Sequence, residues 1–196
     1  MKKGFQLLAA ALMMAGTTFA QVKWSADPAH TNARFSVEHL GISFVDGEFT
    51  KVNGAVDAKT DKDFNGAAIN FSIDVNSIDT RIEARDGHLK SPDFFDAAKY
   101  GTMSLKSVSF TKVKGNQYKL VADLTIKDVT KRVTFDVLQN GGIITDPWGK
   151  TRAGFTAKAK INRQDFHLSY NDKLPSGISA VGNTVEIVIN TELVKG

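Results

Sequence analysis

Hydrophobic and polar residues alternate with a period of two along much of the chain. The clearest runs cover residues 69–75, 118–126, 133–137, 155–161 and 185–190. In the first run, Ile69, Phe71 and Ile73 alternate with Asn70 and Ser72. A period of two places the apolar side chains on one face of a β-strand. The pattern therefore predicts an all-β protein whose strands each bury one face.

Changes of phase interrupt this alternation. One of them separates two pairs of apolar residues, Met103 with Leu105 and Val108 with Phe110. It predicts a β-bulge near Lys106 and Ser107, and Phe49 and Val52 are out of step in the same way. Bulges curl a sheet towards closure. We expect about eight antiparallel strands, a number that closes a barrel either packed solid or wide enough for one small ligand. All four prolines fall outside the runs, as sheet interiors require.

One segment, near residues 80–96, breaks the β pattern. Thr80 and Glu83 have the spacing of a capping box, which predicts a short helix from about Arg81 to Leu89. Ser91 followed by a proline is typical of a second helix start. A helical excursion with adjacent aromatic residues between two strands is suited to cover one mouth of a barrel.

The first twenty residues have the features of a secretory signal peptide. Lys2 and Lys3 precede an apolar run from Leu7 to Ala15, and residues 18–20 resemble a cleavage site. The run is too short to cross a bilayer, which takes roughly 20 apolar residues. Cleavage would leave residues 21–196 as one domain, with no later transmembrane segment. We expect export to the periplasm, with extracellular secretion as the weaker alternative.

Composition narrows the chemistry that the chain could perform. Lys and Arg number 25 against 21 Asp and Glu, too even a balance to favour nucleic acid as a partner. The chain contains no cysteine, which excludes disulfides and thiolate chemistry. No sequence feature requires a homodimer, although an exposed barrel edge or mouth would support one.

Arg85 and His88 are the main candidates for chemistry, because residues three apart share one face of a helix. With Asp86 beside them, they could hold an anionic head group, position a base, or form a structural hydrogen-bond cluster. We favour the structural cluster over catalysis, because no recognisable nucleophile motif occurs. Head-group binding falls between these alternatives.

A metal site is not expected. The histidines at 30, 39, 88 and 167 are scattered without ligand spacing. We expect His30, which closely follows Asp27 and Pro28, to fix the first strand. Asp61 and Asp63 are expected in a solvated turn rather than a calcium site.

Several motifs in order resemble the YceI-like family. They are Asp27-Pro-Ala-His30 through Gly41, Asp46-Gly47-Glu-Phe49, Gly54, Asp79-Thr80 through Arg85-Asp86-Gly-His88 to Asp96, Leu124-Thr-Ile126 through Lys131, Gly154-Phe155, and Arg163-Gln-Asp165-Phe166. Each motif alone is weak, but together they cover nearly the whole mature chain. Two positions depart from the family pattern: Thr31 replaces a usual serine, and His167 stands where glycine is common.

The resemblance implies an extended, lipocalin-like, eight-stranded barrel that binds polyisoprenoid or similar long-chain lipids. On that basis we expect an exported lipid-binding protein for transport or storage, without a cofactor, holding a polyprenyl or quinone-type molecule. The expected pocket residues are Phe35, Val37, Phe49, Phe71, Ile73, Phe94, Phe95, Leu105, Leu124, Phe135, Phe155 and Ile187. The candidates for the head group are His39, Arg85, Asp86 and His88. The alternatives are a periplasmic enzyme acting on a prenyl lipid and a ligand-free structural or stress-response module.

Overall fold

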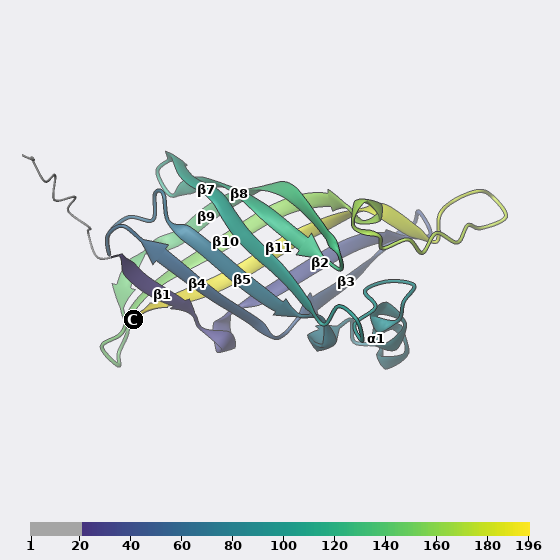
Figure 1. Ribbon diagram of the computed structural model, residues 1–196, viewed down its shortest axis with the longest axis horizontal. Coiled ribbons are helices and arrows are strands. Elements are labelled where there is room, and N and C mark those ends of the chain that lie inside the picture. Colours follow the sequence, from purple (N-terminus) through teal and green to yellow (C-terminus); the bar gives the residue numbers. More distant parts are fainter. Residues whose placement is uncertain (1–20) are drawn as a thin grey trace, which may run out of the picture.

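The computed structural model describes residues 21–196 and folds them into one antiparallel sheet (Figure 1). The predicted signal peptide, residues 1–20, lies outside the described residues. The strands are β1 (Val22–Ala26), β2 (Asn32–His39), β3 (Ser43–Phe49), β4 (Val52–Ala58), β5 (Ala68–Asp74), β6 (Ile78–Asp79), β7 (Thr102–Lys114), β8 (Gln117–Ile126), β9 (Val129–Thr145), β10 (Thr151–Asn162) and β11 (Val181–Lys195). One α-helix, α1 (Glu83–Lys90), and three 3-10 turns, η1 (Pro28–His30), η2 (Val75–Ser77) and η3 (Arg163–Phe166), complete the described elements.

The pairing of β1 with β11 closes the sheet into a barrel. The closed ring has eight members in the order β1, β4, β5, β7, β8, β9, β10 and β11. The predicted eight-stranded antiparallel barrel is therefore confirmed. Figure 1 shows an elongated barrel with α1 at one end and the C-terminus at the other.

The remaining three strands extend the barrel at the end that carries α1. β2 pairs with the first part of β11, while β1 pairs with its last residues, so β1 and β2 act as one strand interrupted by η1. Residues 50–51 interrupt β3 and β4 in the same way, and η2 interrupts β5 and β6. Two of these interruptions are joined, because the backbone amide of Lys51 donates to the hydroxyl of Ser77 at 3.0 Å. This break explains why Phe49 and Val52 differ in phase.

The alternation predicted from the sequence is the one that the strands show. In β8 the side chains of Tyr118, Leu120, Ala122, Leu124 and Ile126 are all buried, and the intervening residues are not. The predicted bulge is also present, since the register of β7 against β8 shifts between residues 107 and 109. The shift lies one or two residues beyond the predicted position, and it leaves Val108 exposed, contrary to the prediction that it shares the inward phase of Phe110.

The helix prediction was correct in kind and wrong in detail. α1 begins two residues later than predicted and ends one residue later, and its N-cap, Ile82, makes no side-chain cap hydrogen bond. The predicted capping box is absent because Arg81 adopts a left-handed φ of 68°. In addition, the hydroxyl of Thr80 donates to the carboxylate of Asp86 instead of accepting from a backbone amide of the first turn. The second helix start at Ser91 was wrong, because turns follow there. Its hydroxyl nevertheless accepts from the amide of Asp93, at 3.3 Å.

An aromatic cluster fills the barrel at the end opposite α1. Trp24, which is 1% exposed, lies with its ring centroid 5.0 Å from that of Phe64, and Phe64 packs edge-on against Phe155 at 4.9 Å. Phe110 and Tyr118 stack beside them with centroids 4.7 Å apart. We call this the closed end. Within residues 21–196, no helix is long and apolar enough to cross a membrane.

Phe64 is the residue whose loss should affect the closed end most. Replacement by alanine should lower the free energy of unfolding by about 3–5 kcal/mol, because it removes a buried ring and leaves a void. Urea unfolding followed by circular dichroism measures this loss. Val113→Ala, at a residue that is 62% exposed, is the control and should cost little. Equal losses for both variants would contradict this account.

Candidate functional site

A cavity of about 300 Å³ lies inside the barrel towards the end that carries α1. This size is at the lower end of small-molecule sites, which span about 300–1,000 Å³. Most of the residues expected to form a pocket line it: Phe35, Val37, Phe49, Ile73, Phe94, Phe95, Leu105, Leu124, Phe135 and Ile187. They come from β2, β3, β5, β7, β8, β9 and β11 and from the turn after α1. The cavity wall is therefore made of inward-facing residues from most of the barrel.

A second, smaller chamber of about 50 Å³ lies deeper, next to the closed end. The other two expected pocket residues, Phe71 and Phe155, line this chamber and not the larger cavity. Leu105 and Ile189 line both spaces and so form part of the partition between them. The two spaces together form an apolar interior that runs from the α1 end towards the aromatic cluster.

Two glycines allow phenylalanine rings to lie flat against the barrel wall. Gly47 is the cross-strand partner of Phe35, and Gly54 is the partner of Phe71. A Cβ atom at either glycine would collide with the ring of its partner. Only glycine leaves this space, so the absence of a side chain at these two positions determines where the two rings lie in the wall.

Most polar residues of the cavity lie at its α1 end, which we call the mouth. Arg85 of α1 lines it, and its guanidinium donates from Nε to the hydroxyl of Thr80 and from Nη2 to the carbonyl of Thr80, both at 2.8 Å. Asp86 accepts from the hydroxyl of Thr80 at 2.5 Å and from its amide at 2.9 Å. Thr80 itself is 1% exposed. These bonds fix the angle at which α1 leaves the barrel.

The structure separates Asp86 from the other head-group candidates. His39, Arg85 and His88 line the mouth, whereas Asp86 does not. Its carboxylate is directed to Thr80, a role that the spacing along the helix does not reveal. Asp86 anchors the helix to Thr80, and its place in the expected head-group set stays a prediction.

His88 is held by aromatic rings and a carboxylate. Its Nε2 lies 2.9 Å from Asp93, and its ring packs edge-on against Phe94 at 5.1 Å and Tyr170 at 5.3 Å. Further in, Phe95 packs edge-on against Phe49 at 5.6 Å. The predicted cover thus joins the loop before β11 to the helix and reaches down to the barrel wall.

Arg163 lies at the mouth and was not predicted to be part of the site. Its side chain is 2% exposed, yet it donates to three backbone carbonyls: Leu168 at 2.5 Å, Gly182 at 2.8 Å and Val181 at 3.1 Å. Burial lowers the pKa of Arg163. No carboxylate among residues 21–196 forms an ion pair with it. The sequence did carry a signal, because Arg163 continues the inward phase of Phe155 to Ile161.

The YceI-like domain matches residues 24–193 of the chain. The chain belongs to the YceI-like family.

Several known proteins resemble this chain in sequence or in fold. "Protein YceI" of Salmonella arizonae is 32% identical over 190 residues, covering 96% of this chain and 94% of that protein. A Campylobacter jejuni YceI protein has a TM-score of 0.69 at 28% identity, over 81% of this chain and 90% of that one. Burkholderia cenocepacia BcnA shows the same fold, with a TM-score of 0.72 at 21% identity over 85% of this chain and 98% of its own.

A third solved structure carries a binding function in its name. It is a polyisoprenoid binding domain from Saccharophagus degradans implicated in plant cell wall breakdown, with a TM-score of 0.61 at 15% identity. The match covers 88% of this chain and 98% of that one. The name of that domain specifies binding and no reaction.

One departure from the YceI-like pattern has a backbone explanation. His167 ends η3 with a left-handed φ of 58°, a conformation that glycine adopts without strain. The imidazole points away from the barrel, is 65% exposed and has Nδ1 3.2 Å from Asp128. His167 therefore sits outside the cavity lining and leaves the apolar interior unchanged.

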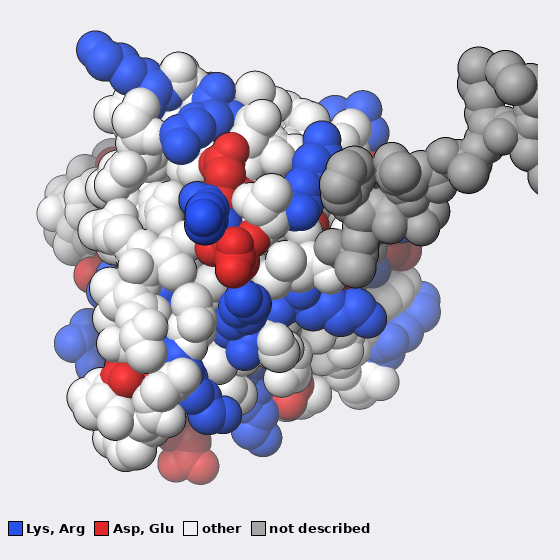
Figure 2. Space-filling view, turned by 90° about the vertical axis from the view of Figure 1, so that its left-hand side faces the viewer, with Lys and Arg blue, Asp and Glu red and all other residues white. Residues whose placement is uncertain are grey.

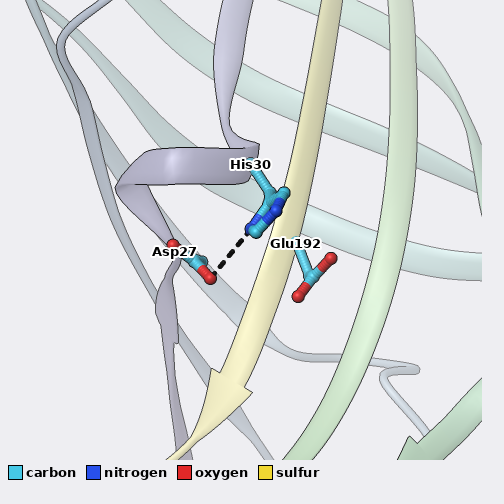
Figure 3. Close-up of side chains that lie close together, drawn as sticks. All are labelled: Asp27, His30 and Glu192. Atoms are coloured by element: carbon cyan, nitrogen blue, oxygen red, sulfur yellow. Dashed lines mark hydrogen bonds and ion pairs between the residues drawn. The ribbon is translucent and has the colours of Figure 1, made fainter. Parts of the chain in front are cut away.

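Three potential metal ligands approach one another on the outer face of this YceI-like barrel, as Figure 3 shows: Asp27, His30 and Glu192. His30 Nδ1 lies 3.0 Å from Asp27, whose other oxygen caps η1 by accepting from the amide of residue 29. The space between the carboxylates is taken by Arg152, which pairs with Asp27 at 2.7 Å and also with Glu192. The cluster is thus an ion-pair network, and His30 helps to fix the first strand.

Arg152 should make stability depend on acid. Its guanidinium lowers the pKa of Asp27 from 3.8 to about 2, so the stabilisation is complete above pH 3.8 and is lost as the pH falls towards about 2. Arg152→Met should lower the melting temperature at neutral pH, and the gap to the unaltered protein should close between these pH values. Melting curves across the acid range measure it; a gap that does not change with pH would contradict the assignment.

Arg163 should be far more important to stability than an exposed arginine. Arg163→Met removes the donor from one buried and two part-buried backbone carbonyls and should lower the free energy of unfolding by about 3 kcal/mol or more, because bonds to charged donors contribute about 1.5–3 kcal/mol each. Arg132→Met is the matched control, since Arg132 is 60% exposed and pairs only with Asp123. Chemical denaturation of both variants measures the difference, and similar small losses would refute a clamping role.

Proposed function

We propose that this protein binds a long-chain apolar lipid of the isoprenoid type, with the tail inside the barrel and the polar group at the mouth. The observation that carries the proposal is the polarity of the cavity: its wall is largely apolar, and most of its charged and polar residues, such as His39, Arg85 and His88, lie at the mouth. Each CH₂ group moved from water into such a space contributes about 0.8 kcal/mol, so a long chain needs few directed contacts.

The named binding function of the Saccharophagus degradans domain supports the choice of ligand class. That domain has the same fold, and its name specifies a polyisoprenoid. The proposal extends this class to the present chain because two apolar spaces follow one another from the α1 end towards the closed end. A polyprenyl or quinone-type molecule is the occupant that we infer.

The polar end of the ligand is assigned to Arg85, His88 and His39. Arg85 keeps one guanidinium nitrogen, Nη1, outside its two bonds to Thr80. His88 and His39 lie on the same opening. These groups suit an anionic or carbonyl-bearing head group, with hydrogen-bond donors directed at its oxygens.

We infer that the protein works in the periplasm, where it carries or stores its ligand. Residues 1–20 have the charge, apolar run and cleavage pattern of a signal peptide. A barrel that shields an apolar chain from water suits a compartment that lies between two membranes. The homodimer stays a prediction, and light scattering of the purified protein tests it.

Protein purified from its natural compartment should contain a long-chain lipid. Organic extraction followed by mass spectrometry should recover an isoprenoid in excess of a mock preparation. Turnover of a prenyl lipid that disappears in Arg85→Ala would favour the enzyme alternative. Recovery of no lipid, together with no uptake of added prenyl lipid, would favour a ligand-free module.

Variants that fill the two spaces should change lipid uptake differently. Ala33 lines the large cavity and Ala157 the deep chamber. Ala33→Trp should abolish uptake, whereas Ala157→Trp should still bind short prenyl chains but exclude the longest ones. Uptake of a series of prenyl alcohols of increasing length, measured by mass spectrometry on folded protein, tests this. Ala29→Trp, at an exposed position in η1, is the control and should bind the whole series.

A further inference from the structure

Two exposed loops project beyond the strands at the α1 end of the barrel. One is the β2–β3 turn with the first two residues of β3, residues 40–44, and the other is residues 174–179, part of the yellow-green loop in Figure 1. Both contain the tripeptide Gly-Ile-Ser, at 41–43 and 177–179, and both glycines have a left-handed φ, 71° and 84°. We call these two loops the mouth tips. Each places an isoleucine at its turn.

The mouth tips present large apolar side chains to solvent. Ile42 is 84% exposed, Phe44 is 69% exposed and Ile178 is 46% exposed. Single exposed apolar residues are common on protein surfaces, but an exposed apolar cluster marks an interaction site. The clustering of these three residues therefore indicates an interaction surface.

The tips lie side by side and form one surface. The amide of Leu40 donates to the carbonyl of Ala180 at 3.1 Å. A Cβ atom on Gly41 would lie 3.2 Å from the Cγ2 atom of Ile178, so the two Gly-Ile-Ser turns are in contact. The hairpin of the second tip is held by the amide of Leu174, which donates to Ile178 at 2.8 Å.

This surface continues into the cavity wall. The first tip is bounded by His39 and Val45, and both of these line the mouth. The second tip is followed directly by Ala180 and begins four residues after Tyr170, and both of these residues also line the mouth. The chain thus leaves the cavity wall, forms an exposed apolar turn and returns to the wall, and it does so twice.

Neither tip contains a charged residue, and the charged pair nearest in sequence to the second tip, Asp172 and Lys173, lies just before it. The opposite end of the barrel differs, because Figure 2 shows Lys and Arg side chains spread over it with Asp and Glu among them. Charged side chains are costly inside a bilayer, whereas isoleucine, leucine and phenylalanine enter it readily. The composition of the tips suits a bilayer as the surface that they contact.

The geometry points to the mouth tips as the element that inserts into a phospholipid bilayer when the lipid enters or leaves the barrel. This inference rests on the proposed function. A long-chain lipid that crossed water alone would be disfavoured by about fourfold for every exposed CH₂ group. A mouth set against the bilayer removes that step, because the tail can then pass between membrane and cavity without crossing bulk water.

Tryptophan fluorescence tests which end meets the membrane. The chain has two tryptophans: Trp24, buried at the closed end, and Trp148, which is 80% exposed in the turn between β9 and β10. In a Trp148→Phe background, Ile178→Trp should shift its emission to the blue on phosphatidylcholine vesicles and be quenched by brominated phosphatidylcholine. Trp148 in the unaltered protein should do neither. A response from Trp148 alone, or from neither position, would overturn the inference.

A transfer assay tests whether the contact matters for exchange. The double variant Ile42→Ser and Ile178→Ser should transfer a fluorescent prenyl lipid between phosphatidylcholine vesicles about tenfold more slowly or worse, since each isoleucine loses apolar contact with the bilayer. The matched control, Ile144→Ser with Val113→Ser, removes exposed apolar side chains at the opposite end and should transfer normally.

A third measurement separates the two proposals. The tip variant should still take up the same amount of prenyl lipid when it is added from detergent, and its melting curve should be unchanged. If no form of the protein takes up the lipid, the proposed function fails. If uptake is normal and transfer is as fast in the tip variant as in the unaltered protein, the mouth tips are not a membrane contact.

Discussion

The architecture depends on the backbone pairing of β11. This strand bonds to β10 along one edge and, along the other, first to β2 and then to β1. β1 and β2 each pair with only part of β11, and η1 lies between them. The ion pairs of Arg152 with Asp27 and Glu192 stabilise this junction on the outer face of the barrel. Closure leaves the ring without a free edge. The apolar faces of β2, β10 and β11 then form one continuous wall.

The mouth is the place where that pairing is incomplete. The register between β11 and β2 shifts between Val181 and Val185. The carbonyls of residues 181 and 182 accept instead from the guanidinium of Arg163, which also holds the carbonyl of Leu168. A buried side chain thus replaces a stretch of backbone ladder. These side-chain hydrogen bonds hold the barrel wall together where the loop between Leu168 and Val181 leaves the sheet.

The strands were predictable because each has one buried face, and the period of two records that face directly. The break at residues 50–51 appeared only as a change of phase, because its cause lies in pairing with Ser77, far along the chain. Similarly, the spacing of Thr80 and Glu83 indicated a capping box, but Asp86 competes for the same hydroxyl and Arg81 turns the chain. Local patterns do not report such competition. Arg163 was not predicted to be part of the site because an arginine on the inward face of a strand is uncommon.

The aromatic cluster around Trp24 and Phe64 determines by which end a bound molecule can enter and leave the barrel. It makes the interior a blind tube, with an opening at the α1 end and a plug at the other. A linear occupant too long to turn around inside must back out along the path by which it came. The end that enters first emerges last, so the barrel hands over such a molecule in the orientation in which it was received.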